Sequence, residues 1–424
     1  MDFLRILSDQ RDELLATDTT SLCSRKEESN ISLDSKLAQI VIGVRRSGKS
    51  TLCQKVLLQS NVNFAYVNFD DERLIEIKTD QLDEILQTLY RLNGQFTHLF
   101  LDEIQNIKGW PLFVNRLLRQ GLHLILTGSN ANLLSAELST HLTGRYHQIE
   151  LYPFSFSEYC QATKVDISSH STKASALRLR ALDKYLLNGG FPELVETDMP
   201  SDYTKSLLNA IVNKDICRRY NVRYKETLWR LANLALDRFC QEISYHDVSK
   251  SLSIQSIHTA KNYMAYLENA YLVQSLPKFS YKTTERQSGK KYYAVDMAFI
   301  SNHDNIIQSD NLGWRLENTI AIELMRRLNK ESDRLYYLRK HKNFEVDFII
   351  TERTHIKELI QVCYDFTKPS TKLYNREIGG LIKGAEFTGC NNLTLIIMQG
   401  ESRDIFSQDK TIKIVTATDW LLNR

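Results

Sequence analysis

Short, continuous apolar runs alternate with helical patterns over the first third of the chain. The runs have the length of strands and occupy residues 38–44, 64–69, 98–101 and 122–127. Strands that are apolar on both faces and separated by helices are typical of a parallel sheet with helices on both sides. We therefore predict an α/β domain over residues 36–155, preceded by an amphipathic helical segment in residues 1–35.

The pattern of apolar positions changes twice after this domain. Leucines recur at helical spacing after residue 175, which predicts a helical domain over residues 175–300. Residues 301–424 combine one long amphipathic helix, residues 314–328, with new runs of strand length. These runs occupy residues 335–338, 346–350, 358–363, 393–398 and 412–415. The chain is thus predicted to end in a third domain of the α/β type.

The composition is that of an ordinary folded protein. Of 424 residues, 42% are apolar and 25% are charged, and 54 basic against 51 acidic residues give a net charge of +3. A nucleic-acid surface would therefore have to come from local clusters of basic side chains. No apolar run reaches the roughly 18 residues that span a bilayer, and the seven cysteines lack the spacing of disulfide scaffolds or zinc sites. We expect a cytoplasmic protein with no membrane association.

A glycine-rich motif follows the first predicted strand. Residues 43–50, GVRRSGKS, match the phosphate-binding pattern GxxxxGK[ST] and lead into a helical stretch. In this context backbone N–H groups point at a phosphate, Lys49 reaches the β- and γ-phosphates, and the Ser50 hydroxyl can ligate Mg²⁺. The predicted nucleotide-binding residues are Gly43, Arg46, Ser47, Gly48, Lys49, Ser50 and Thr51. The side chains of Arg45 and Arg46 are expected to pack or to pair with charges, because side chains inside such a loop normally face away from the phosphates.

A carboxylate pair ends the third apolar run. In residues 98–103, HLFLDE, the run places Asp102 at the carboxyl end of its strand, facing the phosphate loop. There Asp102 can hold Mg²⁺ through its water shell, and Glu103 can orient and polarise the attacking water. We predict Asp102 and Glu103 as catalytic residues and Ser50 with Asp102 as the Mg²⁺ site. An acidic pair after a core strand is common by itself, and only its combination with the loop gives it this role.

Two further polar residues are candidates for contacts with the γ-phosphate. Asn130, or its neighbour Ser129, follows the fourth run and could hold the attacking water or sense the phosphate. It could equally cap a following helix. Arg145 could stabilise transition-state charge in its own chain or on a neighbouring subunit, or it could be a solvated loop residue. The sequence leaves both pairs of interpretations open.

The motifs and their order resemble one known family. After the phosphate loop come LDEIQ (101–105), LTGSN (126–130), LTGR (142–145), LYPFSFSEY (151–159), YLLNGGFPELV (185–195) and EVDFII (345–350). This series resembles the AAA-type ATPases of bacteria and archaea that carry an uncharacterised C-terminal domain, and the resemblance covers nearly the whole chain. It implies an ATPase related to the replication-initiator and signalling branches of the AAA superfamily, with ATP and Mg²⁺ as cofactors. An oligomer is compatible with the resemblance, and substrate and partners are left undefined.

The helical domain contains a pattern associated with DNA binding. Residues 243–273 read as a short helix, a turn and a second helix, and the following strands would form a wing. In such a winged helix the second helix can enter the major groove of DNA. The candidate DNA contacts are His258, Lys261, Lys282, Lys290 and Lys291. The alternative is a module that packs against protein and whose lysines form a solvated face.

The C-terminal domain carries an incomplete set of nuclease-type residues. Glu317 on the long helix, Asp347 on a strand, and Gln361 and Cys363 on the next strand have the spacing of restriction-endonuclease-like folds. Active members use a carboxylate and a lysine at the last two positions to bind Mg²⁺ and activate water. Gln361 lacks the negative charge of the carboxylate, and Cys363 lacks the positive charge of the lysine. We predict a nuclease-like fold with catalysis lost or severely weakened, whose carboxylates hold a weak metal or pair with nearby basic residues.

The predicted fold class is therefore α/β, with a P-loop NTPase domain, a helical and winged-helix domain and a restriction-endonuclease-like domain. Two functional hypotheses follow. In the first, a slow Mg²⁺-dependent ATPase uses its nucleotide state to reposition its C-terminal region on double-stranded DNA. In the second, the same cycle is a regulatory switch that acts on a protein partner without DNA. A third hypothesis, an ATP-dependent nuclease, requires the incomplete C-terminal site to retain activity.

Overall fold

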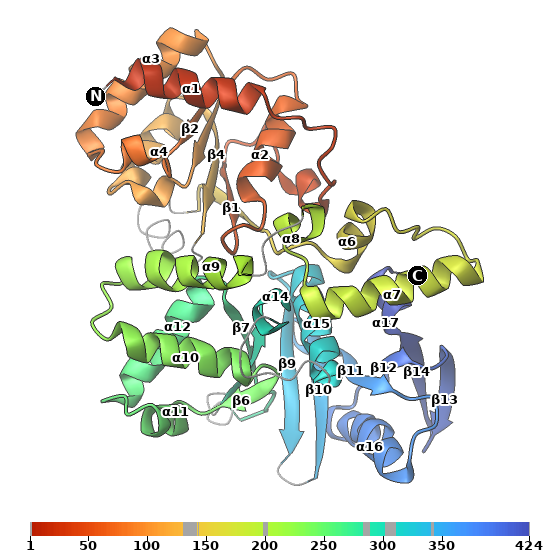
Figure 1. Cartoon of the computed structure of the whole chain (residues 1–424). Helices are drawn as coiled ribbons and strands as arrows, with labels where there is room; N and C mark the ends of the chain where they lie inside the picture. The colour runs from red at the N-terminus through yellow and green to blue at the C-terminus, as the bar shows by residue number, and fades with distance from the viewer. Residues whose placement is uncertain are drawn as a thin grey trace. The chain divides into compact units, whose positions relative to one another are not determined.

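The chain folds into two compact units. Figure 1 shows the computed structural model, which describes residues 2–129, 142, 144–197, 202–282, 289–301, 311–340 and 343–423. The N-terminal unit comprises Met1–Pro153 with Asn269–Tyr271, and the C-terminal unit comprises Phe154–Glu268 with Leu272–Arg424. Each unit has β-sheet structure and a hydrophobic core of its own.

The N-terminal unit is built on a five-stranded parallel sheet with the strand order β2-β3-β4-β1-β5. The strands are β1 Ala38–Ile42, β2 Phe64–Asn68, β3 His98–Asp102, β4 His123–Gly128 and β5 Tyr146–Glu150. The sheet confirms the predicted parallel α/β architecture, with β4 between β1 and β3. Strand β5 was not predicted, because this edge strand alternates between half-buried, exposed and buried residues and has no continuous apolar run.

Helices complete the N-terminal unit. They are α1 Phe3–Leu15, α2 Lys49–Leu58, α3 Leu82–Asn93 and α4 Trp110–Arg119, with short helical turns η1 Lys26–Asn30, η2 Glu72–Leu74, η3 Thr79–Gln81 and η4 Ile104–Asn106. Helix α1 is the predicted amphipathic segment: it buries Phe3, Leu7 and Leu14 and packs against α3 and β2. A core cluster joins α2 to the sheet through buried residues that include Leu52, Val41, Phe100 and Ile125. This packing fixes the start of α2, where the phosphate loop ends.

The first part of the C-terminal unit is helical, as its leucine spacing predicted. Its helices are α6 Phe156–Ala162, α7 Thr172–Asn188, α8 Pro192–Glu196, α9 Tyr203–Ala210, the π-helix η5 Ile211–Arg218 and α10 Lys225–Asp237. Among the described residues of the whole chain, no helix is both long and apolar enough to cross a membrane.

A small antiparallel sheet follows α10. Along the chain come β6 Gln241–Ile243, α11 Tyr245–Ser251, α12 Ile257–Asn269, β7 Val273–Pro277, β8 Lys290–Ala294 and α14 Ala298–Ser301. The strand order is β6-β8-β7, and β8 pairs antiparallel with both neighbours. Successive side chains of a strand point to opposite faces, so the adjacent Lys290 and Lys291 of β8 enter different surroundings.

The C-terminal unit ends in a six-stranded mixed sheet with the order β13-β14-β12-β11-β10-β9. Its strands are β9 Asp333–Lys340, β10 Phe344–Glu352, β11 His355–Asp365, β12 Leu393–Gln399, β13 Arg403–Ser407 and β14 Lys410–Thr416. Strands β9, β10 and β11 pair antiparallel, β11, β12 and β14 pair parallel, and β13 is an antiparallel edge. The five predicted strands are all present, and β13 was missed because its residues are exposed or half-buried.

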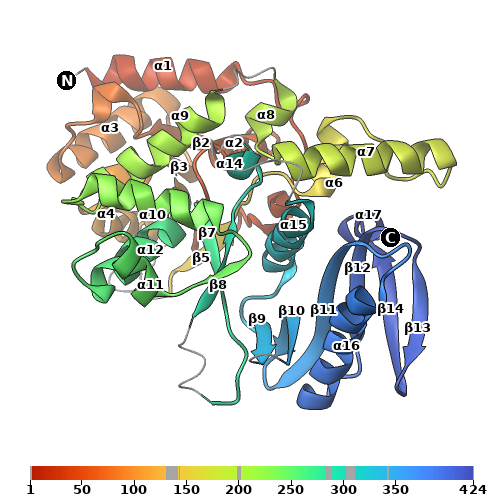
Figure 2. The same ribbon diagram turned by 60° about the horizontal axis from the view of Figure 1, so that its bottom comes forward.

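Three helices accompany this sheet: α15 Leu312–Arg327, α16 Thr371–Thr388 and α17 Ala417–Leu421. Helix α15 contacts β11, and α16 packs against β10, β11 and β12, which Figure 2 shows as a helix lying across the sheet. The core between α16 and the sheet includes Ile378, Leu381, Val346 and Leu359. The arrangement places the start of α15, the start of β10 and the second half of β11 around a common pocket.

Candidate functional site

The phosphate loop connects β1 to α2 in a conformation that requires glycine at both ends. Gly43 has a φ of 155°, and a Cβ there would lie 2.1 Å from the carbonyl oxygen of Leu151. Gly48 has a φ of 91° and caps the N-terminus of α2, which begins at Lys49. The loop and the first turn of α2 therefore present backbone N–H groups in the manner of an anion site.

Two side chains of this loop fit a bound nucleotide. The Lys49 side chain is buried, and its ammonium donates to the carbonyl oxygen of Val44 at 3.0 Å. The Ser47 hydroxyl is also buried, and none of the described residues forms a hydrogen bond with it. A phosphate oxygen is a chemically suitable partner for both groups, so the loop residues fit a nucleoside triphosphate.

The loop and the predicted carboxylate meet directly. The Ser50 hydroxyl donates to Asp102 Oδ1 at 2.8 Å, Thr127 donates to the same oxygen, and the Tyr66 hydroxyl lies 3.4 Å from Asp102 Oδ2. Asp102 is 3% exposed. Burial, followed by the charge of Glu103, raises the pKa of Asp102 to about 6, although the hydrogen bonds from Thr127 and Ser50 lower it. The donor set of a hydroxyl and a carboxylate suits Mg²⁺, whose charge would favour the ionised form of Asp102.

Glu103 is held by its neighbours. It has a left-handed backbone conformation with a φ of 52°, and its N–H donates to the Thr127 hydroxyl at 3.0 Å. Its carboxylate accepts a hydrogen bond from the side-chain amide of Gln105, two residues along the chain. Glu103, for which the sequence predicts the role of general base, therefore lies next to Asp102 and accepts a hydrogen bond from an amide donor.

Two residues that support this site were not predicted from the sequence. Thr127, the penultimate residue of β4, contacts both Asp102 and Glu103, whereas the predicted residues of the same segment were Ser129 and Asn130. Arg25 lies before β1 and is buried; its guanidinium donates to the carbonyl oxygens of Ser47 at 3.1 Å and Tyr152 at 2.7 Å. A polar residue ending a strand beside the carboxylate strand was a usable signal for Thr127, but a lone arginine outside any motif gave none for Arg25.

The residues predicted to contact the γ-phosphate do not gather at the phosphate loop in the described part of the chain. Asn130 lies outside the described residues, and Ser129 is buried directly after β4. Arg145 precedes β5, where its carbonyl oxygen accepts from the N–H of Ala38 at the start of β1. That is the amino end of the parallel strands, opposite the phosphate loop, and the Arg145 guanidinium lies 3.2 Å from Asn115 Oδ1. The structure does not bring Arg145 to the phosphate loop of its own chain.

The predicted DNA contacts of the C-terminal unit divide into two groups. His258 and Lys261 are exposed on α12, and Lys282 is exposed beyond β7. Lys290 is half-buried, 3.7 Å from Glu268 and 3.1 Å from the Ser275 hydroxyl. The expectation of an exposed Lys291 is wrong, because its side chain points to the inner face of β8 and is 5% exposed. Lys291 is thus no part of a basic stripe on the surface.

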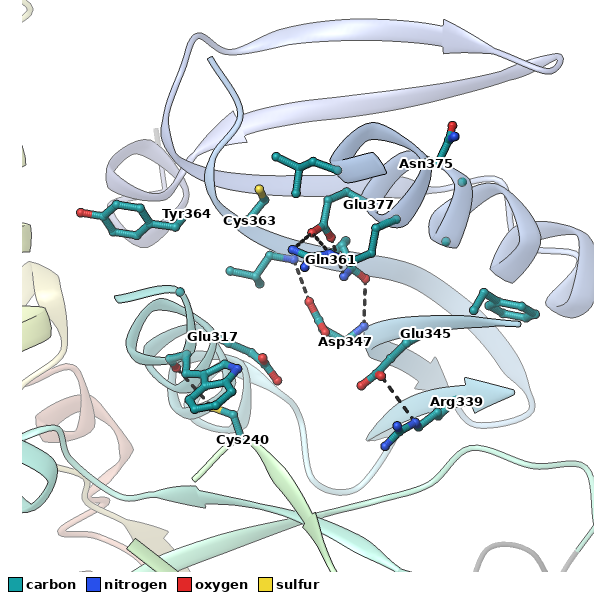
Figure 3. Close-up of a pocket in the computed structure, with 18 of the residues that line it drawn as sticks. Cys240, Glu317, Arg339, Glu345, Asp347, Gln361, Cys363, Tyr364, Asn375 and Glu377 are labelled. Atoms are coloured by element: carbon teal, nitrogen blue, oxygen red, sulfur yellow. Dashed lines mark hydrogen bonds and ion pairs between the residues drawn. The ribbon is translucent and has the colours of Figure 1, made fainter. Parts of the chain in front are cut away.

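The four residues of the predicted incomplete nuclease site line one cavity of about 670 Å³. Figure 3 shows Glu317 of α15 and Asp347 of β10 turned toward one another, with Gln361 of β11 beside Asp347. The Val362 N–H donates to Asp347 Oδ2 at 2.9 Å, and the Asp347 N–H donates to the side-chain oxygen of Gln361 at 3.1 Å. The Cys363 thiol lies 3.3 Å from the Asp365 carbonyl oxygen and points away from Asp347 (Figure 3).

Charged residues that were not predicted as part of this cavity also line it, among them Glu377 and Lys291. The Gln361 amide donates to Glu377 Oε2 at 2.8 Å, and Glu377 is 1% exposed on α16. Burial raises the pKa of Glu377, against the opposing charge of Arg376. Lys291 reaches the cavity from β8 and pairs with Glu317 at 3.2 Å and with Glu345 at 2.7 Å. Within the described part of the chain, no three His, Cys, Asp or Glu side chains are placed to hold a metal ion.

Comparison with known proteins defines the class of the N-terminal unit. Residues 35–160 match the AAA domain, and residues 179–310 match a domain of unknown function, DUF8612. An AAA domain implies binding and hydrolysis of ATP with Mg²⁺, so the predicted class of P-loop ATPase is confirmed.

Two relatives match nearly the whole length of the chain. An uncharacterized protein of Methanocaldococcus jannaschii is 32% identical over 428 residues, covering 97% of this chain and 95% of that protein. An uncharacterized protein of Haemophilus influenzae is 29% identical over 404 residues, covering 92% of this chain and 95% of that protein. The Walker-type ATPase of Pyrococcus abyssi aligns with a TM-score of 0.44 and 16% identity over 66% of this chain and 95% of its own. The chain belongs to the family of AAA-domain proteins that includes the Methanocaldococcus jannaschii relative.

Proposed function

We propose that this protein is a slow Mg²⁺-dependent ATPase whose nucleotide site is formed by the phosphate loop and the carboxyl end of β3. The contact that carries the proposal is the 2.8 Å hydrogen bond between the Ser50 hydroxyl and Asp102 Oδ1. In a P-loop ATPase these two groups are the protein ligands on the Mg²⁺ side of the site. Their contact supports the view that the loop and the acidic strand end serve one bound nucleotide.

Each residue of the site has one task in this proposal. The glycine-framed loop wraps the phosphates, and the Lys49 ammonium exchanges the Val44 carbonyl oxygen for phosphate oxygens. Ser50 and Asp102 hold Mg²⁺, which neutralises charge on the phosphate oxygens when bound. Glu103 accepts a proton from the attacking water. Thr127 fixes both acidic residues of the pair through its hydroxyl.

The contact between Gln105 and Glu103 supports slow turnover. An amide that donates to the base carboxylate competes with the water that this carboxylate has to bind. Release of Glu103 Oε2 from Gln105 would free this oxygen for the water and raise the basicity of the carboxylate. We infer that this release, triggered by nucleotide or by a partner, precedes hydrolysis.

We further propose that the segment from α10 to β8 is a winged helix that contacts double-stranded DNA. The order of its elements and the antiparallel β6-β8-β7 sheet support this fold. The exposed His258 and Lys261 of α12 support a contact with DNA. In the same proposal the six-stranded domain is nuclease-like without cleavage activity.

One observation favours the alternative, in which the switch acts on a protein partner. Ile257, the first residue of α12, is 50% exposed next to the candidate DNA contacts. An apolar side chain at this position suits a protein interface better than a phosphate backbone.

Two measurements on the purified full-length protein test the ATPase proposal. Lys49→Ala should abolish binding of a fluorescent ATP analogue, because it removes the charge on the phosphates. Glu103→Gln should keep that binding and lower the release of phosphate by about a hundredfold. Equal turnover by Glu103→Gln and the wild type would remove Glu103 from its role, and intact binding by Lys49→Ala would overturn the site itself.

A further inference from the structure

One ammonium group lies among three carboxylates in the pocket of the C-terminal unit. Lys291 Nζ lies 3.2 Å from Glu317 Oε1, 2.7 Å from Glu345 Oε1 and 3.9 Å from Asp347 Oδ1. We call Glu317, Glu345 and Asp347 the carboxylate cage. Its members come from α15 and β10, and the lysine comes from β8 of the other sheet.

The cage is held in place by bonds that leave oxygens directed at the lysine. The Tyr293 hydroxyl donates to Glu317 Oε1 at 3.0 Å. Asp347 Oδ2 accepts from the Val362 N–H, which turns Oδ1 toward Lys291. Arg339 lies 3.7 Å from Glu345 Oε2, whereas Glu345 Oε1 faces Lys291 (Figure 3 shows the pair of Arg339 and Glu345). The oxygens that face the centre therefore converge on a single cation.

The electrostatics of the pocket depend on this cation. Lys291 is 5% exposed, and three carboxylates lie within 3.9 Å of its ammonium nitrogen. The buried positive charge is therefore balanced by its direct neighbours. Without the ammonium, the cage would hold uncompensated negative charge in a largely buried site.

We propose that the chain's own Lys291 ammonium takes the place of a divalent cation among these carboxylates, so that the wild-type pocket excludes Mg²⁺ and Mn²⁺. Carboxylate oxygens are the ligands that these hard cations prefer, and the open cavity leaves room for water ligands. The carboxylate oxygens lie 2.7 to 3.9 Å from the ammonium nitrogen, farther from this central position than the roughly 2.0–2.1 Å of Mg²⁺–oxygen bonds.

This occupancy has a consequence for the chemistry of the C-terminal unit. Hydrolysis of a phosphodiester in such a site needs a metal ion to polarise the phosphate and activate water. A lysine that fills the metal position blocks this step independently of Gln361 and Cys363. The inference stands apart from the proposed ATPase activity, because all of its residues lie in the C-terminal unit.

Binding of Mn²⁺ to nucleotide-free protein tests the proposal. Free Mn²⁺ is measured by electron paramagnetic resonance in a background of Asp102→Asn, which removes the carboxylate of the nucleotide site. In this background the intact pocket should bind no Mn²⁺, whereas Lys291→Met should gain one Mn²⁺ per chain. Adding Asp347→Asn to Lys291→Met should abolish the gain. Lys290→Met is the matched control: it removes the neighbouring lysine of β8, whose partners are Glu268 and Ser275, and should gain nothing.

Several outcomes would overturn the proposal. One is that protein with Lys291 in place binds Mn²⁺ and loses this binding when Asp347→Asn is added. The metal ion and the lysine would then occupy the pocket together. Another is a folded Lys291→Met variant that binds no Mn²⁺. If Lys291→Met does not fold, the double substitution Lys291→Met with Glu345→Gln removes one negative charge together with the ammonium. That variant should fold and bind Mn²⁺ through Glu317 and Asp347; failure to fold in Mn²⁺ or failure to bind would equally reject the claim.

Discussion

The guanidinium of Arg25 donates to the carbonyl oxygen of Ser47 at 3.1 Å, so a residue that precedes the first strand fixes the backbone of the phosphate loop. The same guanidinium bonds to Tyr152 just beyond β5, and the buried arginine links three separate segments of the N-terminal unit. Hydrogen bonds from a buried charged group contribute about 1.5–3 kcal/mol each. The loop is therefore held in shape by contacts outside its own motif.

Replacing Arg25 should weaken nucleotide binding, although Arg25 acts through the backbone of the phosphate loop and not through a phosphate. In Arg25→Ala the Ser47 carbonyl loses its donor and the loop relaxes, so the Kd for ATP should rise by about tenfold or more. Titration with a fluorescent ATP analogue measures the change. Lys26→Ala, which removes the exposed cation next in sequence, is the control and should leave the Kd within about twofold. Equal Kd values for Arg25→Ala and the control would contradict this role of Arg25.

Gln105 should restrain turnover. Because its amide donates to the Glu103 carboxylate, Gln105→Ala frees the base and should raise the rate of phosphate release several-fold at saturating ATP. A steady-state assay of phosphate at saturating ATP gives the rate directly. The double variant Gln105→Ala with Glu103→Gln should be as inactive as Glu103→Gln alone, which ties the gain to the carboxylate. A lower rate in Gln105→Ala would show that the amide positions Glu103 for catalysis.

The raised pKa of Asp102 predicts a dependence of stability on pH. Its pKa is about 6 in the folded protein, against 3.8 for an ordinary aspartate, so folded protein binds a proton more tightly than unfolded protein. The cost of burying the carboxylate is absent below about pH 4, grows as the pH rises to about 6, and is fully present above that. For a pKa raised by about two, the cost is about 3 kcal/mol.

Asp102→Asn isolates this effect. In chelator and without nucleotide, the variant should be more stable than the wild type at pH 8, and the difference should shrink toward pH 4. Chemical denaturation at both pH values gives the free energies of unfolding. A difference that does not change with pH would mean that Asp102 has an ordinary pKa in the folded protein.

Gly43 should tolerate no side chain. A Cβ would lie 2.1 Å from the Leu151 carbonyl oxygen, so Gly43→Ala has to displace the loop and should abolish binding of the ATP analogue. Gly121→Ala is a matched control in the same unit, because Gly121 also has a positive φ, 87°, but no atom lies within 4 Å of its Cβ position. The control should lose about 1 kcal/mol of stability and keep its affinity. Retained affinity in Gly43→Ala would contradict the loop geometry.

The DNA proposal makes a prediction about salt. If Lys261 contacts a phosphate, Lys261→Ala should weaken binding to double-stranded DNA of any sequence and lower the slope of log K against log salt by about one. Lys290→Ala should leave the slope unchanged, because Lys290 is already engaged with Glu268. Fluorescence anisotropy at several salt concentrations provides the slopes. No binding at low salt would favour the protein-partner alternative.

Local pattern determined most of the fold. Strands β1, β3 and β4 could be predicted because each is a continuous apolar run that the parallel sheet buries on nearly all positions of both faces. The edge strand β2 is only half-buried at Phe64, Tyr66 and Asn68, but it still lies within a largely apolar run of strand length. Strands β5 and β13 could not be predicted, because most of their residues are exposed or half-buried and they contain no continuous apolar run. In the nucleotide site, a motif of fixed spacing identified Lys49 and Ser50, and the end of an apolar run identified Asp102. Thr127 and Arg25 act through contacts with residues distant in sequence, and no spacing rule specifies such contacts.

The sequence by itself determined that this chain carries a glycine-rich phosphate loop and an acidic strand end of the P-loop type, because both are short segments whose chemistry follows from their own residues. It also identified Glu317, Asp347, Gln361 and Cys363 as members of one pocket. Only the tertiary structure decided what balances their charge. Lys291 is one of two adjacent lysines on β8. The pairing of β8 with β6 and β7 and its packing against α15 turn Lys291 inward among the carboxylates, whereas Lys290 lies half-buried on the other face. A one-residue difference along a strand reverses the direction of a side chain, and the burial of one face fixes which lysine becomes the buried cation.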